Sequence, residues 1–546
     1  MSTPRGRSTH SPDVVVVGAG FAGLYALRRL RGLGLSVQVY EAGSDVGGTW
    51  YWNRYPGARC DVESLEYSYS FSQELEQEWD WSERYAPQPE ILRYINHVAD
   101  RFDLRRNIQF DTCVTAAAFD ETVNRWAVTT DRGDGVSARF CVLATGCLSA
   151  ATTPDIEGLS SFGGRWYHTG RWPPEGVDLT GQRVGVVGTG SSAIQSIPVI
   201  AEQAAHLVVF QRTPNFSLPA RNRPLDPGTQ AAVKASYPAL RDRARNSYAG
   251  IAVPAPTESA LEVEPAERER RYEAAWGEGG LLSMTTTFRD LILDKAANDT
   301  AAEFIRAKIR EIVVDPDVAR LLTPTDHPFG TKRPCLDAGY FETFNRENVT
   351  LVDLRRSPIT EIVPSGIRTI DAVHELDSIV FATGFDAMTG PVLRIDVSGR
   401  GGQSLRSKWA AGPRTYLGIA TAGFPNLFVV TGPGSPSVLS NMIVAIEQHV
   451  DWIADCITFV GANRLETIEA NVDAEDAWVD HVNELANATL FPTANSWYMG
   501  ANVPGKPRVF MPYVGGLPVY RATCDDVAAA GYRGFTLALG PAAGDG

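Results

Sequence analysis

The chain lacks paired cysteines. Its 546 residues include seven cysteines, and no two of them form a C-x-x-C pair. Disulfide frameworks and zinc sites are built from such pairs, so we expect neither of them here. No other group of histidines, cysteines and carboxylates has the spacing of metal ligands. Unpaired thiols persist in reducing compartments, and this favours a cytoplasmic location.

Positive charge is also in deficit. Lysine and arginine number 50 against 64 acidic residues, which gives a formal net charge of −14 at pH 7. A protein that binds nucleic acid needs a basic face to neutralise phosphates. We therefore expect no nucleic-acid partner.

An unbroken hydrophobic run long enough to cross a membrane is missing as well. Residues 415–446 carry no formal charge, but glycines, prolines and an asparagine interrupt them repeatedly between positions 423 and 436. A lipid-spanning helix needs about 20 mostly apolar residues without such breaks. Residues 1–12 are polar and do not resemble a secretory signal. We expect no membrane association, and buried strand and loop structure at 415–446.

What the chain does contain is a glycine-rich turn between a strand and a helix. The run V-V-V-V at 14–17 is typical of a strand buried on both faces, and G-A-G-F-A-G follows it at 18–23. We expect a helix at 21–33 and a second strand at 36–41 that ends on an acidic residue. This is the complete dinucleotide-binding pattern, in which a carboxylate accepts hydrogen bonds from ribose hydroxyls. The residues predicted to hold this nucleotide are Gly18, Gly20, Gly23 and Glu41.

A second unit with the same plan follows. Its turn, G-T-G-S-S-A, occupies 188–193, and its second strand, at 207–210, leads into Gln211, Arg212 and Thr213 instead of a carboxylate. A carboxylate there would repel a 2′-phosphate, whereas an arginine binds one through two hydrogen bonds. The first unit therefore suits FAD and the second suits NADPH. The residues predicted for the second site are Gly188, Gly190, Ser191, Arg212 and Thr213.

Two Ala-Thr-Gly segments, at 144–146 and 382–384, each follow an apolar strand and flank the second unit. We interpret them as crossings between domains. Residues between 226 and 326 are rich in Ala, Glu and Arg with helical spacing, as at 301–311. The predicted fold is α/β, with two Rossmann-like dinucleotide-binding domains and a mostly helical insertion in the NADPH domain. The predicted boundaries are 1–147 (FAD domain, first part), 148–223 (NADPH domain, first part), 224–331 (helical insertion), 332–385 (NADPH domain, second part) and 386–546 (FAD domain, second part).

A third motif lies just before the second unit. Residues 162–173 read F-G-G-R-W-Y-H-T-G-R-W-P and fit the pattern F-x-G-x-x-x-H-x-x-x-W-P. With the stretches at 47–61, 330–333 and 496–502, this motif makes the chain resemble the type I Baeyer–Villiger monooxygenases from residue 13 to 534. Within that family it looks most similar to the phenylacetone and steroid ketone monooxygenases.

The resemblance implies an FAD- and NADPH-dependent enzyme that converts aryl, aliphatic or cyclic ketones and O2 to esters or lactones through a C4a-peroxyflavin. It assigns the fixed positive charge that stabilises the peroxide and the oxyanion to Arg333, because an arginine is protonated at any working pH. It makes Asp61 the carboxylate that orients this arginine. It adds Gly48, Trp50, Asp61, Lys332 and Trp497 to the cofactor-binding residues, and Ser437, Val438, Leu439 and Met442 to the substrate side.

Other functions compete with this one. A flavin monooxygenase that oxidises amine nitrogen or sulfide sulfur would use the same cofactors without needing Arg333, and the Trp-Pro ending of the third motif and the Lys-Arg pair at 332–333 argue against it. A disulfide reductase needs a redox cysteine pair, which is absent. A flavin-binding redox sensor without catalysis would be expected to lose Asp61 or Arg333. For His168, in the third motif, we expect a structural or hinge role.

Overall fold

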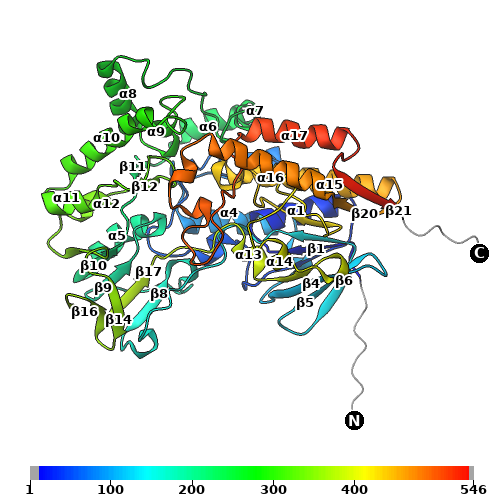
Figure 1. The fold of residues 1–546 in the computed structure, drawn as a ribbon, viewed down its shortest axis with the longest axis horizontal. Coiled ribbons are helices and arrows are strands. Elements are labelled where there is room, and N and C mark those ends of the chain that lie inside the picture. The colour runs from blue at the N-terminus through cyan, green and yellow to red at the C-terminus, as the bar shows by residue number, and fades with distance from the viewer. Residues whose placement is uncertain (1–10, 540–546) are drawn as a thin grey trace, which may run out of the picture.

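Two five-stranded parallel sheets organise the computed structural model, which describes residues 11–539 and places the sheets in different halves of the molecule (Figure 1). The first sheet has the order β19 (Leu427–Val429), β7 (Phe140–Leu143), β1 (Val14–Val17), β2 (Val37–Tyr40) and β3 (Ile108–Gln109). The second has the order β13 (Val349–Asp353), β10 (His206–Gln211), β9 (Arg183–Val187), β17 (Ser378–Phe381) and β8 (Arg165–His168). The expected α/β fold with two dinucleotide-binding units is confirmed.

The same tight turn opens both units. Gly18, after β1, has a φ of +104°, and Gly188, after β9, has a φ of +113°. A Cβ atom on Gly18 would lie 2.6 Å from the carbonyl oxygen of Ala144, and one on Gly188 would lie 2.5 Å from that of Ala382. Each Ala-Thr-Gly segment therefore packs directly against a glycine turn. Only glycine fits there, because both the backbone angle and the space exclude a side chain.

Helices follow these turns with ends close to those expected. The helix expected at 21–33 is α1 (Phe21–Gly32), and the strand expected at 36–41 is β2. The helical spacing at 301–311 lies inside α10 (Lys295–Ile312). The uncharged stretch 415–446 contains β19 and loops, and it runs into the start of α15 (Met442–Ala462). Within residues 11–539, no helix has the length and apolar character needed to span a bilayer.

Smaller sheets flank the two parallel ones. The sheet beside the first has the order β18 (Asp396–Ser398), β4 (Val114–Asp120), β5 (Arg125–Thr130) and β6 (Gly135–Ala138). The sheet beside the second has the order β14 (Ile359–Val363), β15 (Gly366–Thr369) and β16 (Val373–Glu375). Two-stranded sheets join β20 (Leu465–Ala470) to β21 (Phe535–Leu539) and β11 (Ser217–Pro219) to β12 (Cys335–Asp337). The pairing of β11 with β12 brings the two ends of the helical region together.

The helical region between β11 and β12 contributes to both cores. Its α-helices are α6 (Pro227–Ala235), α7 (Tyr237–Arg245), α8 (Pro265–Glu278), α9 (Leu281–Thr285), α10 and α11 (Pro316–Leu322). Tyr237 of α7 is buried in the core that contains β1, whereas Phe304 of α10 is buried in the core that contains β9. The domain boundaries stated above stay predictions, and their outer limits at residues 1 and 546 lie outside the described residues.

The C-terminal part of the chain returns to the first unit. There α15 packs along α1, and the Asp451 carboxylate accepts hydrogen bonds from Tyr25 Oη (2.9 Å) and Arg29 Nε (3.0 Å). The remaining α-helices are α2 (Thr49–Trp52), α3 (Gln73–Glu78), α4 (Gln88–Arg101), α5 (Ser191–Gln203), α12 (Tyr340–Thr343), α13 (Gly390–Leu393), α14 (Leu405–Lys408), α16 (Val472–Asn487) and α17 (Leu517–Ala529).

A buried ion pair fixes α7 against the first core, and it yields a stability prediction. Arg241 Nε donates to Glu76 Oε1 over 2.8 Å, and both side chains are almost fully buried. Arg241→Met should lower the free energy of unfolding by about 3–5 kcal/mol, because Glu76 loses its counter-charge inside the protein. Arg243→Met, at an exposed position on the same helix, should leave the midpoint of thermal unfolding unchanged. Equal midpoints for the two variants would contradict this prediction.

Candidate active site

The guanidinium of Arg333 and the carboxylate of Asp61 form the centre of the candidate site. Arg333 Nε donates to Asp61 Oδ2 over 2.6 Å, and Nη2 donates to Oδ1 over 3.0 Å. The remaining nitrogen, Nη1, donates to the carbonyl oxygen of Val438 over 2.8 Å. Three segments far apart in sequence therefore meet at one planar group, and the two-point contact with the carboxylate fixes its plane.

The surroundings of Arg333 keep it charged. Burial lowers the pKa of the guanidinium, but the Asp61 carboxylate more than reverses this effect, so the pKa lies above its ordinary value. Tyr498 lies beside the same group; burial raises its pKa to about 12, and the charge of Arg333 opposes that rise. About a quarter of each side chain of the ion pair stays accessible, 25% for Arg333 and 22% for Asp61. The site thus presents a permanent cation with an open face.

An apolar wall borders this cation. Val438 uses its carbonyl to hold Arg333 and its side chain to join a buried apolar cluster, in which Leu439, Met442 and Trp497 also pack. Ser437, the residue before Val438, adopts a positive φ of 40° and is fully buried. Of the four residues predicted to face the substrate, Val438 contacts Arg333 directly, Leu439 and Met442 pack in the same apolar cluster as Val438, and Ser437 precedes it in the chain. Such a wall limits access of water to the charge, which strengthens electrostatic interactions there.

The first glycine turn has the shape of a nucleotide cradle. A Cβ on Gly48 would lie 2.9 Å from Cα of Gly20, so the two backbones touch. Helix α1 begins after Gly20 without a side-chain cap, which leaves N–H groups of its first turn for a phosphate. The adjacent Trp50 is buried and donates from Nε1 to Tyr67 Oη over 3.2 Å. These residues fit the pyrophosphate of a dinucleotide.

Glu41 binds backbone groups of its own unit. Its Oε2 accepts from the N–H of Ala19 over 2.6 Å, and its Oε1 accepts from that of Gly43 over 2.7 Å. Burial raises the pKa of this carboxyl, and the two N–H donors oppose the rise. Each oxygen keeps a second lone pair for a ribose hydroxyl, because a carboxylate offers about four acceptor positions. The sequence did not reveal that Glu41 also ties the glycine turn to its strand.

The second unit gathers positive charge at the end of β10. Neither Arg212 nor Lys332 makes an ion pair or a side-chain hydrogen bond with any residue in the range 11–539. Burial lowers the pKa of Lys332, Asp326 opposes this, and the nearby charges of Arg212 and Arg355 lower it further. The adjoining Thr213 accepts at its carbonyl from Thr189 Oγ1 over 2.7 Å. Two unpaired cations near the C-terminal end of β10 fit a 2′-phosphate.

His168 lies in a different place from Arg333. The residue is 3% exposed, its Nδ1 accepts from the N–H of Gly170 over 3.0 Å, and its Nε2 lies 3.3 Å from Thr383 Oγ1. Thr383 belongs to the second Ala-Thr-Gly segment. His168 thus connects the third motif to the second Ala-Thr-Gly segment, and no group of candidate metal ligands exists among residues 11–539.

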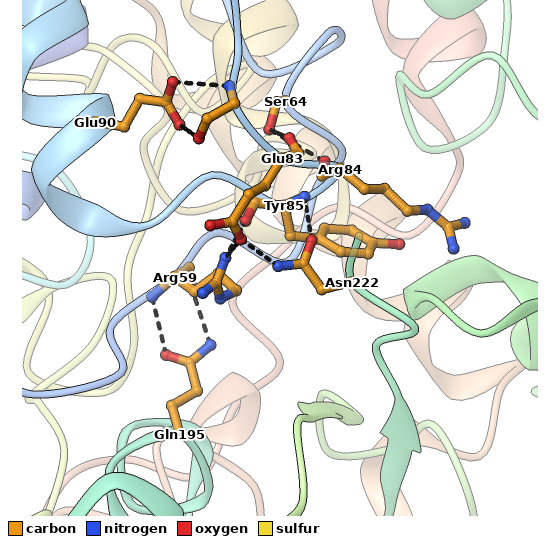
Figure 2. Close-up of polar contacts among 9 residues, drawn as sticks. Arg59, Ser64, Glu83, Arg84, Tyr85, Glu90, Gln195 and Asn222 are labelled. Atoms are coloured by element: carbon orange, nitrogen blue, oxygen red, sulfur yellow. Dashed lines mark hydrogen bonds and ion pairs between the residues drawn. The ribbon is translucent and has the colours of Figure 1, made fainter. Parts of the chain in front are cut away.

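A polar network that sequence reasoning missed holds the segment that precedes Asp61 (Figure 2). Arg59 Nη1 donates to Glu83 Oε2 and to the carbonyl of Tyr85, each over 2.5 Å. The Asn222 side chain, which comes from the start of the helical region, bonds Glu83 and accepts from the N–H of Tyr85. No local pattern could have revealed these contacts, because their partners are separated by up to 139 positions.

The chain is similar in sequence to known proteins. Residues 12–236 match the family model described as pyridine nucleotide-disulphide oxidoreductase. A Baeyer-Villiger monooxygenase from Pseudooceanicola batsensis is 46% identical over 95% of this chain and 95% of that protein. The phenazine N-monooxygenase PhzNO1 of Lysobacter antibioticus is 44% identical over 97% of each chain.

Solved structures agree in fold along nearly the whole chain. An oxidised steroid monooxygenase bound to NADP has a TM-score of 0.93 and 57% identity, and the match covers 97% of this chain and 100% of that one. The structure of OTEMO in complex with FAD and NADP has a TM-score of 0.94 and 42% identity, with the same coverage.

Proposed function

The chain belongs to the Baeyer–Villiger monooxygenases, and on this premise we propose that it oxidises ketones to esters or lactones with FAD, NADPH and O2. The observation that carries the proposal is the Arg333 guanidinium, held by Asp61 and by the carbonyl of Val438 beside an apolar wall. A ketone bound there would meet a fixed positive charge in a site with little water. Which ketone the enzyme takes depends on the shape of that wall.

The cofactors of this chain are FAD and NADPH, and we propose that FAD binds at the first glycine turn and NADPH at the second. Gly18, Gly20, Gly48 and the N-terminus of α1 would hold the pyrophosphate of FAD, and Glu41 would bind its ribose. When bound, the flavin supplies the redox chemistry by which electrons from NADPH activate O2. Trp497, in the apolar cluster beside Arg333, would pack against the nicotinamide coenzyme.

Arg333 acts on the oxygen atom of the ketone. As a nucleophilic oxygen adds to the carbonyl carbon, the carbonyl oxygen gains negative charge, and a cation already in place stabilises it without reorganisation. Asp61 takes Nε and Nη2 of the guanidinium, and Val438 takes Nη1. These contacts fix the direction of the charge, so that little is lost in aligning it during the reaction. The apolar wall keeps water from competing for it.

A specific observation supports a second candidate function, which is oxidation of an amine nitrogen or a sulfide sulfur. The phenazine N-monooxygenase shares 44% identity with this chain over nearly its full length. Oxygen transfer to nitrogen or sulfur produces no alkoxide on the substrate, so Arg333 would not be needed to stabilise one. Dependence of the product on Arg333 therefore separates the two functions.

The proposed location is the cytoplasm. All seven cysteines, of which only Cys113 is exposed, are free thiols in the structure, and reducing compartments maintain thiols in this state. Fractionation of the native cells checks this, and recovery of the protein from an oxidising compartment would contradict it.

The unpaired Arg212 gives a prediction about the choice of coenzyme. A hydrogen bond to a charged group contributes about 1.5–3 kcal/mol, so Arg212→Ala should lower kcat/KM for NADPH by about 10- to 150-fold. The value for NADH, which has no 2′-phosphate, should change little. Steady-state oxidation of both coenzymes measures this. Arg165→Ala, at an exposed position on the edge strand β8 of the same sheet, is the matched control, and equal losses for NADPH and NADH in Arg212→Ala would contradict the assignment.

The fixed charge of Arg333 gives the main test of the proposed reaction. Arg333→Ala should still bind FAD and consume NADPH, but ester formed per NADPH oxidised should fall by about 10²- to 10³-fold. The electrons should then appear as hydrogen peroxide. Arg333→Lys should recover only part of the yield, because an ammonium group cannot make the two-point contact with Asp61.

The assay uses an aryl ketone, a cyclic ketone, an aryl sulfide and a tertiary amine. Wild-type ester yield from Arg333→Ala on any accepted ketone would overturn the proposed mechanism. If the wild type forms only the sulfoxide or N-oxide, and Arg333→Ala forms as much, the second candidate function is the correct one.

A further inference from the structure

The side-chain amide of Gln195 pairs with the backbone of Arg59 as a neighbouring strand would (Figure 2). The N–H of Arg59 donates to Gln195 Oε1 over 3.3 Å, and Gln195 Nε2 donates to the carbonyl oxygen of Arg59 over 3.1 Å. Gln195 lies on α5, the helix that follows the second glycine turn. Arg59 belongs to the first dinucleotide-binding unit. The two hydrogen bonds therefore join the two dinucleotide-binding units.

Further contacts seat the same segment on α5. Tyr55 Oη donates to Gln195 Oε1 over 2.8 Å. Gly57, with a φ of +81°, approaches the helix so closely that a Cβ atom there would lie 2.2 Å from the carbonyl oxygen of Gln195. A left-handed glycine is needed both for the turn and for the approach. The position of segment 55–59 is thus set by its contacts with α5.

The other edge of this segment belongs to the first unit. The N–H of Cys60 donates to the carbonyl of Ala86 over 3.2 Å, and the N–H of Gln88 donates to that of Ala58 over 2.9 Å. Arg59 therefore lies between a backbone bridge on one side and Gln195 on the other. Asp61, the partner of Arg333, is two residues further on.

Helix α5 also contacts the strand that follows Arg333. The Cys335 thiol, at the start of β12, lies beside the hydroxyl of Ser191 and 3.2 Å from Asn215 Nδ2. Ser191 and Gln195 are four residues apart, so they project from the same face of the helix. One turn of α5 therefore lies against the chain on both sides of the ion pair, two residues before Asp61 and two residues after Arg333.

From this geometry we propose that Gln195 is a positioning residue, which aligns Asp61, and through it Arg333, with the glycine turn of the second unit. The proposal rests on the proposed function only where it concerns turnover. Because the contact joins the two units, it fixes the position of the Arg333 guanidinium relative to the glycine turn that binds the coenzyme. Loss of the amide should leave each unit folded and the ion pair less well placed.

Hydrogen exchange tests the contact without reference to activity. Gln195→Leu removes all three hydrogen bonds of the amide while keeping a side chain of similar size, and Tyr55→Phe removes only the one from Tyr55. In Gln195→Leu, peptides that cover residues 55–61 should exchange about 2- to 10-fold faster, as expected when one hydrogen bond that protects an amide is lost. Peptides from α16 should be unchanged. Unaltered exchange at 55–61 in Gln195→Leu would overturn the proposal.

Turnover tests the consequence. Gln195→Leu should lower ester formed per NADPH oxidised by about 10-fold, with KM for NADPH within about 3-fold of the wild type, and Tyr55→Phe should show a smaller loss of the same kind. Gln203→Leu, at an exposed position on the same helix, is the matched control and should behave as the wild type. A rise in KM for NADPH with unchanged ester yield would overturn the proposal, because it would show that Gln195 serves coenzyme binding alone.

A double variant shows whether Gln195 acts through the ion pair. In an Asp61→Ala background, Gln195→Leu should reduce the remaining ester yield by less than about 2-fold, because residues that act through one another are not additive. If the loss of ester yield in the double variant equals the product of the losses in the two single variants, the proposal is overturned. If the wild type forms no ester from any ketone, the proposed function fails, and the exchange result still decides whether Gln195 holds the segment.

Discussion

The ion pair between Arg333 and Asp61 is the constraint on which the rest of the site depends. Its members are 272 positions apart, yet they meet through two hydrogen bonds of 2.6 and 3.0 Å. Withdrawing either charge from water is unfavourable unless the partner arrives in good geometry. The fold therefore has to place both side chains within hydrogen-bonding distance of each other. β12 begins two residues after Arg333, the bridged segment before Asp61 holds the carboxylate, and the carbonyl of Val438 accepts from the last donor.

The two dinucleotide-binding units share the same glycine turn but carry opposite charges at the end of their second strands. In both, a glycine at positive φ packs against an Ala-Thr-Gly segment, which leaves the following helix with an open N-terminus. The charge at the end of the next strand then differs. Glu41 is buried and holds its own turn, whereas Arg212 is unpaired and close enough to Lys332 to lower the pKa of that lysine. This difference in charge supports the proposed assignment of FAD to the first unit and of NADPH, which carries a 2′-phosphate, to the second.

Similarity of sequence does not by itself settle what the oxygen atom is transferred to. A Baeyer-Villiger monooxygenase and a phenazine N-monooxygenase are both more than 40% identical to this chain along nearly its full length. A shared frame can thus serve substrates with different electronic demands. The geometry around Arg333 favours a substrate that develops negative charge on oxygen, since the guanidinium is fixed at three points next to an apolar wall. That argument comes from the site and not from the fold.

The sequence alone determined the features whose physics is local: both strand–turn–helix units, and the charges at the ends of their second strands. Each depends on residues within a few turns of one another, so hydrophobic runs and glycine spacing predict them. Resemblance supplied Arg333 and Asp61 as individual residues. Only the tertiary structure decided that Val438 completes their contact, that the helical region divides between two cores, and that Gln195 pairs with Arg59. These contacts join residues more than 100 positions apart, and no periodicity along the chain encodes them.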